Sequence, residues 1–276
     1  MKFDMHCHTK EGSPDAKLAI EDYIKILSSK GFDGMMISDH DSYNGFRYYK
    51  KRNFDKIYPD FVVIQGIEYD TSDAGHILCI LPDDVTLKIF EIKGMPVKML
   101  IDVVHHLGGI LGPAHPYGIR YQSYFNSLKQ HKQMQYMKKF DFVERFNACE
   151  DAESNHKADY IARSYNKPGF GGSDAHRAAV AGMGHTIFPE SVKIRCNNDL
   201  ITFIKEDGKG IVTGGSLYTG TAKNKLGVFY DFLLQLYWVY NKSGSKINKF
   251  RHDHHLKNIF LKEISSKYEY EPEDFD

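Results

Sequence analysis

Short apolar runs in the first two thirds of the chain are each bordered by a compact motif of His, Asp or Glu. These motifs are His6-Cys7-His8, Ser38-Asp39-His40-Asp41, Gly66-Ile67-Glu68, Gly75-His76, Ala114-His115-Pro116 and Ser173-Asp174-Ala175-His176. Apolar runs of this length are typical of buried strands. Strands that leave a barrel at the same edge bring the side chains after them to one mouth. The pattern therefore predicts one polar site assembled from distant parts of the sequence.

Strand-like and helical segments alternate up to about residue 213. Helical spacing predicts helices over residues 20–29, 97–106 and 153–165. Apolar runs predict strands over residues 2–5, 34–38, 61–65, 76–81, 110–112, 140–146, 170–172 and 211–212. Short connections imply right-handed crossovers and a parallel sheet. A closed α/β barrel brings six strand ends together, whereas an open doubly wound sheet makes one crevice at its switch point. We therefore expect a barrel.

The composition changes near residue 216. The length of 276 residues suits one barrel domain over residues 1–215 and a C-terminal helical extension over residues 216–276, packed on the barrel. A helix is expected at residues 228–240, followed by a segment rich in Lys and His at 242–262. Lys+Arg and Asp+Glu both number 36, so net charge indicates neither nucleic acid nor a membrane as partner.

The cysteines show no paired spacing, which suits reduced thiols; they are Cys7, Cys79, Cys149 and Cys196. The chain begins without a signal-peptide core, and no run is long enough to span a membrane. We therefore expect a cytoplasmic protein that does not act at a membrane. Nothing in the sequence specifies an oligomeric state.

The candidate metal ligands have a spacing that suits a shared site. His6 and His8 point to the same side of an extended strand, and Asp174 and His176 have the same spacing. Barrel closure would bring the first and last strands together, with Asp174 beside the His pair. Glu68 can bridge two ions because a carboxylate has two oxygens. Imidazole and carboxylate ligands bind zinc, manganese or iron.

Other candidate ligands are His76 and His115 for a second ion, and Asp15, His40 and His176 for a third. Asp39 or Asp41 are candidates to orient an imidazole from outside the ligand set. The remaining histidines, including those at positions 252–255, are expected to be ordinary polar residues.

The ordered motifs resemble the PHP family, the polymerase and histidinol phosphatase domain, from Phe3 to about Thr213. Residues 4–9 (DMHCHT) are similar to the first family motif, and a Ser-x-Asp-x-x-Leu stretch begins at Ser13. Residues 37–41 (ISDHD), 109–116 (GILGPAHP) and 172–176 (GSDAH) are similar to the second, third and fourth motifs.

The resemblance implies a distorted (β/α)7 TIM-like barrel with two or three divalent metal ions at its mouth. The implied ligand sets are His6, His8, Glu68 and Asp174 for one ion, Glu68, His76 and His115 for a second, and Asp15, His40 and His176 for a third. Many family members carry a His near Asp15, so Glu11 or a water is the alternative ligand there. Glu144 and Asn147 match a Glu-x-x-Asn pattern, for which substrate binding and support of the centre are both open.

Neighbouring divalent ions suit phosphoester hydrolysis, because they lower the pKa of a water and stabilise the leaving oxygen. No Ser or Cys nucleophile motif is present. The sequence therefore predicts a metal-dependent phosphoesterase with zinc, manganese or iron. The predicted catalytic residues are His40, Glu68, Asp174 and His176, with His40 or His176 as candidate general acids. Arg120 and Arg177 are candidates to bind phosphate, together with Glu144 and Asn147.

The expected substrate is a small phosphomonoester such as histidinol phosphate or a nucleotide. One alternative is a phosphodiesterase or 3'-5' exonuclease acting on short oligonucleotides. The basic segment at 242–262, preceded by Tyr237, Trp238 and Tyr240, suits that partner through charge and stacking. Another alternative is a non-catalytic, metal-stabilised binding module, whose site would be saturated by protein ligands.

Overall fold

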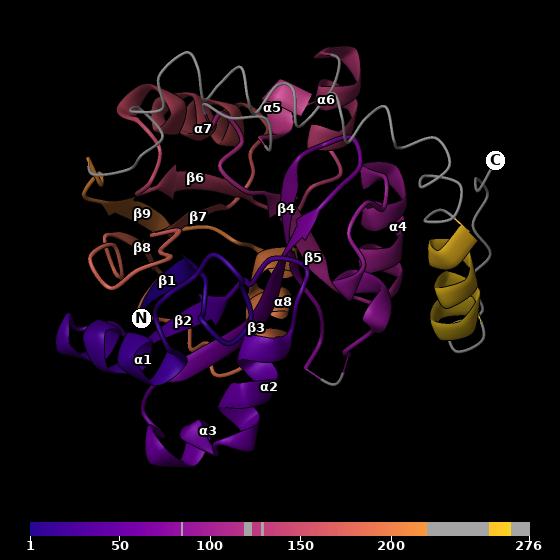
Figure 1. The fold of residues 1–276 in the computed structure, drawn as a ribbon. Helices are drawn as coiled ribbons and strands as arrows, with labels where there is room; N and C mark the ends of the chain where they lie inside the picture. Colours follow the sequence, from indigo (N-terminus) through magenta and orange to yellow (C-terminus); the bar gives the residue numbers. More distant parts are fainter. Residues whose placement is uncertain (84, 119–122, 128–129, 220–253, 266–276) are drawn as a thin grey trace, which may run out of the picture.

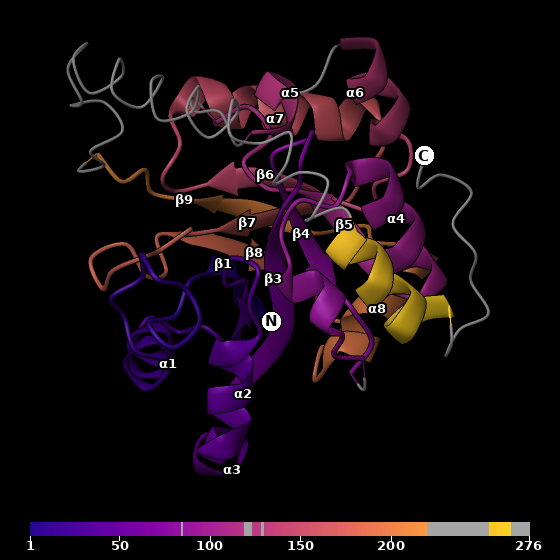
Figure 2. The same ribbon diagram turned by 45° about the vertical axis from the view of Figure 1, so that its right-hand side comes forward.

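The computed structural model describes residues 1–83, 85–118, 123–127, 130–219 and 254–265. Its elements follow in the order β1 (Lys2–Cys7), α1 (Ile20–Ser29), β2 (Gly34–Ile37), α2 (Asn44–Lys51), α3 (Phe54–Ile57), β3 (Val62–Asp70), β4 (His76–Ile80), η1 (Lys88–Glu91), α4 (Val97–His106), β5 (Ile110–Pro113), α5 (Tyr124–Ser127), α6 (Gln130–Met137), β6 (Val143–Asn147), α7 (Ala152–Ser164), β7 (Gly169–Gly172), β8 (Gly184–Ile187), α8 (Asn197–Glu206), β9 (Val212–Gly215) and η3 (Leu261–Ser265). Helices surround the strands on several sides (Figures 1 and 2).

Strands β1 to β7 curl into a distorted barrel. Seven strands form one sheet in the order β5-β4-β3-β2-β1-β8-β9, and β6 and β7 form a parallel pair. The ring closes at two places: Asp141 N donates to Leu111 O between β5 and β6, and Asp174 N donates to His6 O between β7 and β1. β8 and β9 extend the sheet beyond β1. The arrangement confirms the expected α/β, TIM-like barrel class.

The expectation of a uniformly parallel sheet is wrong. β1, β2 and β3 are parallel, but β4 is antiparallel to both β3 and β5, and β8 and β9 also run antiparallel to their neighbours. Only residues 71–75 separate β3 from β4, which leaves no room for a crossover helix. Because β4 runs backward, its first residue, His76, lies at the mouth where the other strands end.

The helices predicted at 20–29 and 97–106 coincide with α1 and α4, and α7 differs from its prediction by one residue at each end. Helices α2, α3, α5, α6 and α8 and strand β8 have no predicted counterpart. β3 is longer than expected and continues to Asp70, so Glu68 lies within the strand rather than after it.

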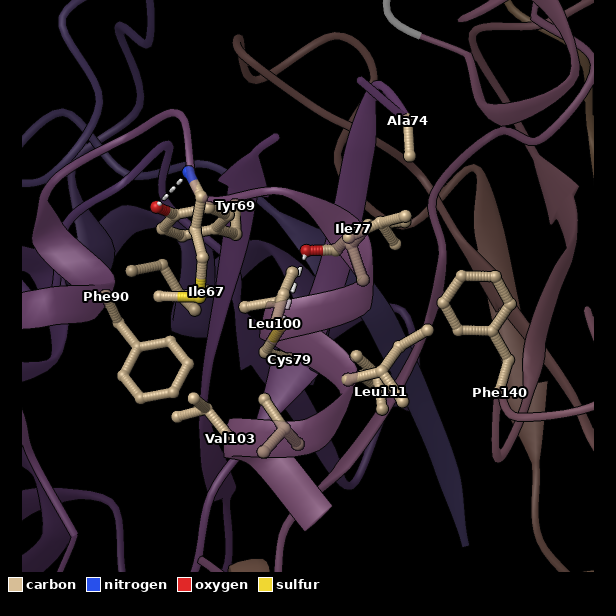
Figure 3. Close-up of a cluster of buried hydrophobic side chains, with 14 of the residues drawn as sticks. Ile67, Tyr69, Ala74, Ile77, Cys79, Phe90, Leu100, Val103, Leu111 and Phe140 are labelled. Carbon is tan, nitrogen blue, oxygen red and sulfur yellow. Dashed lines mark hydrogen bonds between the residues drawn. The ribbon is translucent and has the colours of Figure 1, made fainter. Parts of the chain in front are cut away.

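Helix α4 covers one face of the β3–β4 hairpin. It buries Val97, Leu100, Ile101 and Val104, the i, i+3, i+4, i+7 spacing of an amphipathic helix. Figure 3 shows Leu100 and Val103 facing Ile67 and Cys79 of the two strands. Full burial of one such side chain contributes about 1.5–3 kcal/mol, so this contact holds the hairpin in place behind the mouth.

Residues 254–265 add a helix to the same core. Leu256, Phe260 and Ile264 are buried among the residues of α4 and the hairpin, and Glu263 Oε2 accepts a hydrogen bond from Ile89 N at 3.1 Å. The helix predicted at 228–240 lies outside the described residues, so the division at residue 215 stays a prediction. In the described part of the chain, no helix is long and apolar enough to cross a membrane.

Candidate metal centre

The barrel mouth collects side chains from the ends of six strands and one loop. His6 and His8 come from the end of β1, and the turn after β2 carries His40. Glycine allows β7 to approach β1 closely: a Cβ at Gly172 would lie 2.4 Å from His6 Cβ. The chain after β7 therefore brings Asp174 directly against the His pair, as the sequence predicted.

Glu68 lies at the middle of this centre. Its Oε1 is 2.9 Å from His76 Nδ1 and 3.0 Å from His115 Nε2. Its Oε2 lies 3.2–3.3 Å from ring nitrogens of His6, His8 and His40. Five imidazoles thus surround one buried carboxylate, and each of its oxygens faces a different group of them.

Asp174 completes the group around the first strand. Its Oδ1 lies 3.2 Å from His8 Nε2 and 3.7 Å from His6 Nε2. The two imidazole Nε2 atoms are only 3.1 Å apart. Two ring nitrogens and two carboxylate oxygens therefore converge on one small volume.

Asp15 holds the outer part of the centre. Its Oδ2 lies 3.1 Å from His176 Nε2 and 3.7 Å from His40 Nε2. The alternative ligand Glu11 is placed elsewhere, since its Oε2 accepts from the Ile20 N–H at the start of α1. The placement favours Asp15 as the acidic partner of these two histidines.

The residues fit a cluster of divalent cations. Possible ligand atoms lie within 4.8 Å of one another in three sets: His6, His8 and Glu68; His8, His40 and His176; and His40, Glu68 and His76. Glu68 Oε2 and His115 Nδ1 are among the four buried side-chain N and O atoms of the described residues that lack a hydrogen-bond partner. A cation would satisfy such a carboxylate oxygen at little cost. All nine predicted ligands thus lie in one connected cluster, and their individual roles stay predictions.

Electrostatics differ across the cluster. Burial alone would raise the pKa of Glu68, but His76, His6 and His40 outweigh it and hold that pKa well below its usual range. Burial would lower the pKa of His8, but its hydrogen bonds with Asp174 and Glu68 raise it to about 9. His40 behaves oppositely, because burial lowers its pKa to about 3. The centre without metal therefore holds an ionised Glu68 and a neutral His40.

Glu144 and Asn147 lie behind the ligands. Glu144 Oε1 accepts from His6 Nδ1 at 2.8 Å, and its Oε2 accepts from the His115 backbone N–H. Asn147 Nδ2 donates to Glu144 Oε2 and to Asp174 Oδ2 at 3.1 and 3.2 Å. Of the two roles that the sequence left open, this buried placement favours support of the centre over contact with substrate.

Backbone strain concentrates at the mouth. Asp41, His115 and Asp174 have φ values of 45°, 28° and 51°, and they are three of the five described non-glycine residues with positive φ. Left-handed conformations of such residues cost about 1–3 kcal/mol and cluster at functional sites. The surrounding hydrogen bonds, such as Asp174 N to His6 O at 2.9 Å, hold this strain.

Two supporting residues were not identified from the sequence. Asp4, fully buried on β1, accepts from Ser173 N, Ser173 Oγ and Gly182 N, and burial raises its pKa to about 6. The Ser13 hydroxyl lies 3.2 Å from His8 Nδ1. In the sequence, Asp4 and Ser13 were noted only as members of the family motifs. A buried acid two residues before His6 on a strand was the available signal for Asp4.

Of the two arginines predicted to bind phosphate, the structure describes only Arg177, which is not one of the clustered metal ligands. Arg177 is exposed, with its guanidinium carbon 6.0 Å from the Tyr218 ring centre. Arg120 lies outside the described residues. Asp39 accepts from Thr9 N at 2.6 Å, and Asp41 Oδ1 accepts from Asp70 N at 2.9 Å, so each braces a loop of the centre.

A cavity of about 380 Å³ lies at the other end of β7, away from the centre. Its walls include Arg145, Arg163 and Lys209. Asp159 pairs with both arginines, and Asp207 pairs with Lys209. Each of these three cations is thus already paired with a carboxylate, and the cavity lies apart from the centre.

The fold and the convergent His and carboxylate side chains define a barrel built to hold metal ions at its mouth. The sequence matches the PHP domain family over residues 4–171, and a second family described as PHP-associated over residues 152–207. The chain therefore belongs to the PHP domain family. Family membership and the ligand clusters together support a metal-dependent hydrolase.

Solved structures share the fold at low sequence identity. PsfC from Pseudomonas syringae is 14% identical, with a TM-score of 0.55 over 85% of this chain and 98% of its own. An amidohydrolase from Chromobacterium violaceum, with bound sulfate and no metal, is 12% identical, with a TM-score of 0.54 over 76% and 97%. A proposed metal-dependent phosphoesterase from Bifidobacterium adolescentis is 15% identical, with a TM-score of 0.49 over 63% and 87%. No curated protein sequence matches the chain.

Proposed function

We propose that this protein hydrolyses a small phosphomonoester, with water as the nucleophile, at a centre of two or three divalent metal ions. The observation that carries the proposal is the placement of the two carboxylate oxygens of Glu68. Its two oxygens face two different groups of imidazoles, His76 and His115 on one side and His6, His8 and His40 on the other. A carboxylate placed in this way could serve as a ligand to two ions at once.

The chain offers three ligand groups. His6, His8, Glu68 and Asp174 would hold one ion, Glu68, His76 and His115 a second, and Asp15, His40 and His176 a third. Zinc, manganese and iron all suit imidazole and carboxylate ligands. When bound, neighbouring divalent ions lower the pKa of a water and stabilise negative charge on phosphate oxygens.

The protein's own residues supply orientation and charge. Glu144 directs the His6 ring through Nδ1, which leaves Nε2 turned into the centre. His176 is partly exposed at the mouth, where it would donate a proton to the leaving oxygen. His40 suits this role less well, because its pKa of about 3 leaves it neutral. Arg177 follows His176 directly and is exposed, so we assign it to the phosphate oxygens that do not react. The described residues hold no alternative nucleophile motif.

The rival substrate is a short oligonucleotide cleaved at a phosphodiester. Its support in the sequence is the basic and aromatic segment at 237–262, most of which lies outside the described residues. The partly exposed Asp15, His40 and His176 favour an open site over the saturated site of a binding module. The small phosphorylated substrate therefore remains our proposal.

The test joins metal content to turnover. We would measure bound metal by elemental analysis and phosphate release from a monoester panel, beside p-nitrophenol release from a diester. We expect two or three ions per chain and monoester turnover that is lost in His8→Ala and Asp174→Ala. Turnover of the diester alone would support the nuclease. Less than one ion per chain, with no activity after manganese or zinc is added, would contradict the proposal.

A further inference from the structure

The Ser13 hydroxyl lies among three groups of the metal centre. Its oxygen is 3.2 Å from His8 Nδ1, 3.0 Å from Asp39 Oδ1 and 3.0 Å from the backbone N of His40. Ser13 is buried, so water does not compete for these contacts. Its loop lies between the first two motifs of the chain and contacts a ligand from each.

The position of each proton follows from the chemistry of these groups. A serine hydroxyl has one proton to donate and two lone pairs to accept. The His40 backbone N–H can only donate, so it occupies one lone pair. Asp39 Oδ1 already accepts from the Thr9 backbone N–H, so it acts as an acceptor and the Ser13 proton points to it. The remaining lone pair of Ser13 must accept a proton from His8 Nδ1.

This proton placement decides which nitrogen of His8 faces the centre. A metal-ligating imidazole is neutral, so a proton on Nδ1 leaves a lone pair on Nε2. Nε2 is the atom that lies 3.2 Å from both Glu68 Oε2 and Asp174 Oδ1. Glu144 imposes the same choice on His6 by accepting from its Nδ1. With both Nδ1 atoms protonated, the two Nε2 lone pairs, 3.1 Å apart, would be available to hold a metal ion.

We propose that Ser13 is a positioning residue of the metal centre: it selects the His8 tautomer that binds metal and holds the His40 backbone with the same hydroxyl. The proposal rests on the proposed metal function. One hydroxyl would thereby contact ligands of two different ions: His8, assigned to the ion of His6, His8, Glu68 and Asp174, and His40, assigned to the ion of Asp15, His40 and His176. Partners that fix the tautomer of a ligating His typically change metal affinity by 10–100-fold.

The direct test observes the tautomer. In zinc-loaded wild-type protein with ¹⁵N-labelled histidine, long-range ¹H–¹⁵N NMR spectra should show His8 protonated at Nδ1 and bound through Nε2. Ser13→Ala should weaken zinc affinity by about 10–100-fold, measured by competition with a chelator. Ser13→Thr, which keeps the hydroxyl, should recover most of that loss.

Thr186→Val is the matched control. Thr186 is also a buried hydroxyl that accepts from a backbone N–H, that of Gly171, at 2.7 Å, but it contacts no predicted ligand. Its removal should lower thermal stability without changing zinc affinity beyond about 2-fold. Only residues that contact and orient a metal ligand are expected to change metal affinity.

The outcomes separate this proposal from the metal function itself. Wild-type protein that binds no zinc contradicts the proposed function. Wild-type protein that binds zinc with His8 protonated at Nε2 overturns the role of Ser13, even if Ser13→Ala does not fold. Equal zinc affinities for wild type and a folded Ser13→Ala protein overturn it as well.

Discussion

The metal centre has an inner half and an outer half that differ in how the protein holds them. The inner half, His6, His8 and Glu68, is buried, and Glu144 and Ser13 brace its two imidazoles from behind. The outer half is exposed to solvent: 55% of the Asp15 side chain is accessible, and 23% and 27% of those of His40 and His176. The side chains of the inner half are held in place before any ion binds. Those of the outer half lose more conformational entropy when an ion binds.

This difference predicts the order in which the metal ions bind. Buried ligands with braced rings lose little freedom on binding, so the inner ions should bind tightly. An ion held by Asp15, His40 and His176 shares its site with water and should exchange. An exposed, weakly held position is also the one open to a substrate oxygen.

The largest effect is expected at Glu68, which belongs to both inner ion groups. Glu68→Gln keeps the shape but removes the charge that five imidazoles face. We expect kcat for phosphate release to fall by about 10³-fold or more, because the loss of metal stabilisation removes several kcal/mol. Elemental analysis should show less than half the wild-type metal. Full metal content in this variant would show that the carboxylate does not bridge.

The next prediction compares the two halves directly. His8→Ala should remove most of the bound metal, whereas Asp15→Ala should remove at most one ion and leave the inner ions in place. Elemental analysis after dialysis measures both. Glu11→Ala is the control, since Glu11 lies nearby in sequence and bonds to the start of α1 instead. Equal losses of bound metal in His8→Ala and Asp15→Ala would contradict the proposed difference in metal affinity between the two halves.

The pH dependence of stability should also separate the halves in metal-free protein. The pKa of His8 rises from 6.5 to about 9 on folding, so its contribution is present below pH 6.5 and is lost as pH rises towards 9. The pKa of His40 falls to about 3, so stability is lost as pH falls from 6.5 towards 3. The His8 contribution is at most about 3 kcal/mol.

Denaturant unfolding of the chelated protein at several pH values measures this. His8→Ala should flatten the alkaline side of the profile and His40→Ala the acidic side. Adding zinc should reverse the alkaline trend, because metal ligands must be deprotonated. A single pH profile shared by both variants would contradict the assignment.

The smallest effect is expected at Arg177, which lies outside the ligand cluster. Arg177→Ala should raise KM for a phosphomonoester by about 10-fold with a small change in kcat, as for the loss of binding shared by ground and transition states. Metal content should not change. A large fall in kcat with unchanged KM would instead place Arg177 at the reacting phosphate.

Sequence patterns predicted which residues the fold gathers at the mouth, but revealed less about the residues behind them. Helical spacing located α1 and α4 because each buries one continuous face. A four- or five-residue apolar run does not reveal its direction, so the reversed β4 was missed. Glu144 reaches His6 across 138 residues, and only the folded barrel shows that its carboxylate orients a ring rather than a substrate.

The β3–β4 hairpin has a consequence for the order in which the centre assembles. Glu68 and His76 are eight residues apart and are joined by a five-residue turn, whereas the contact of His6 with Asp174 closes a loop of 168 residues. Closing a long loop costs more chain entropy, so local contacts form earlier in folding. We therefore expect Glu68 to meet His76 early in folding, and the ring of strands to close around that pair afterwards.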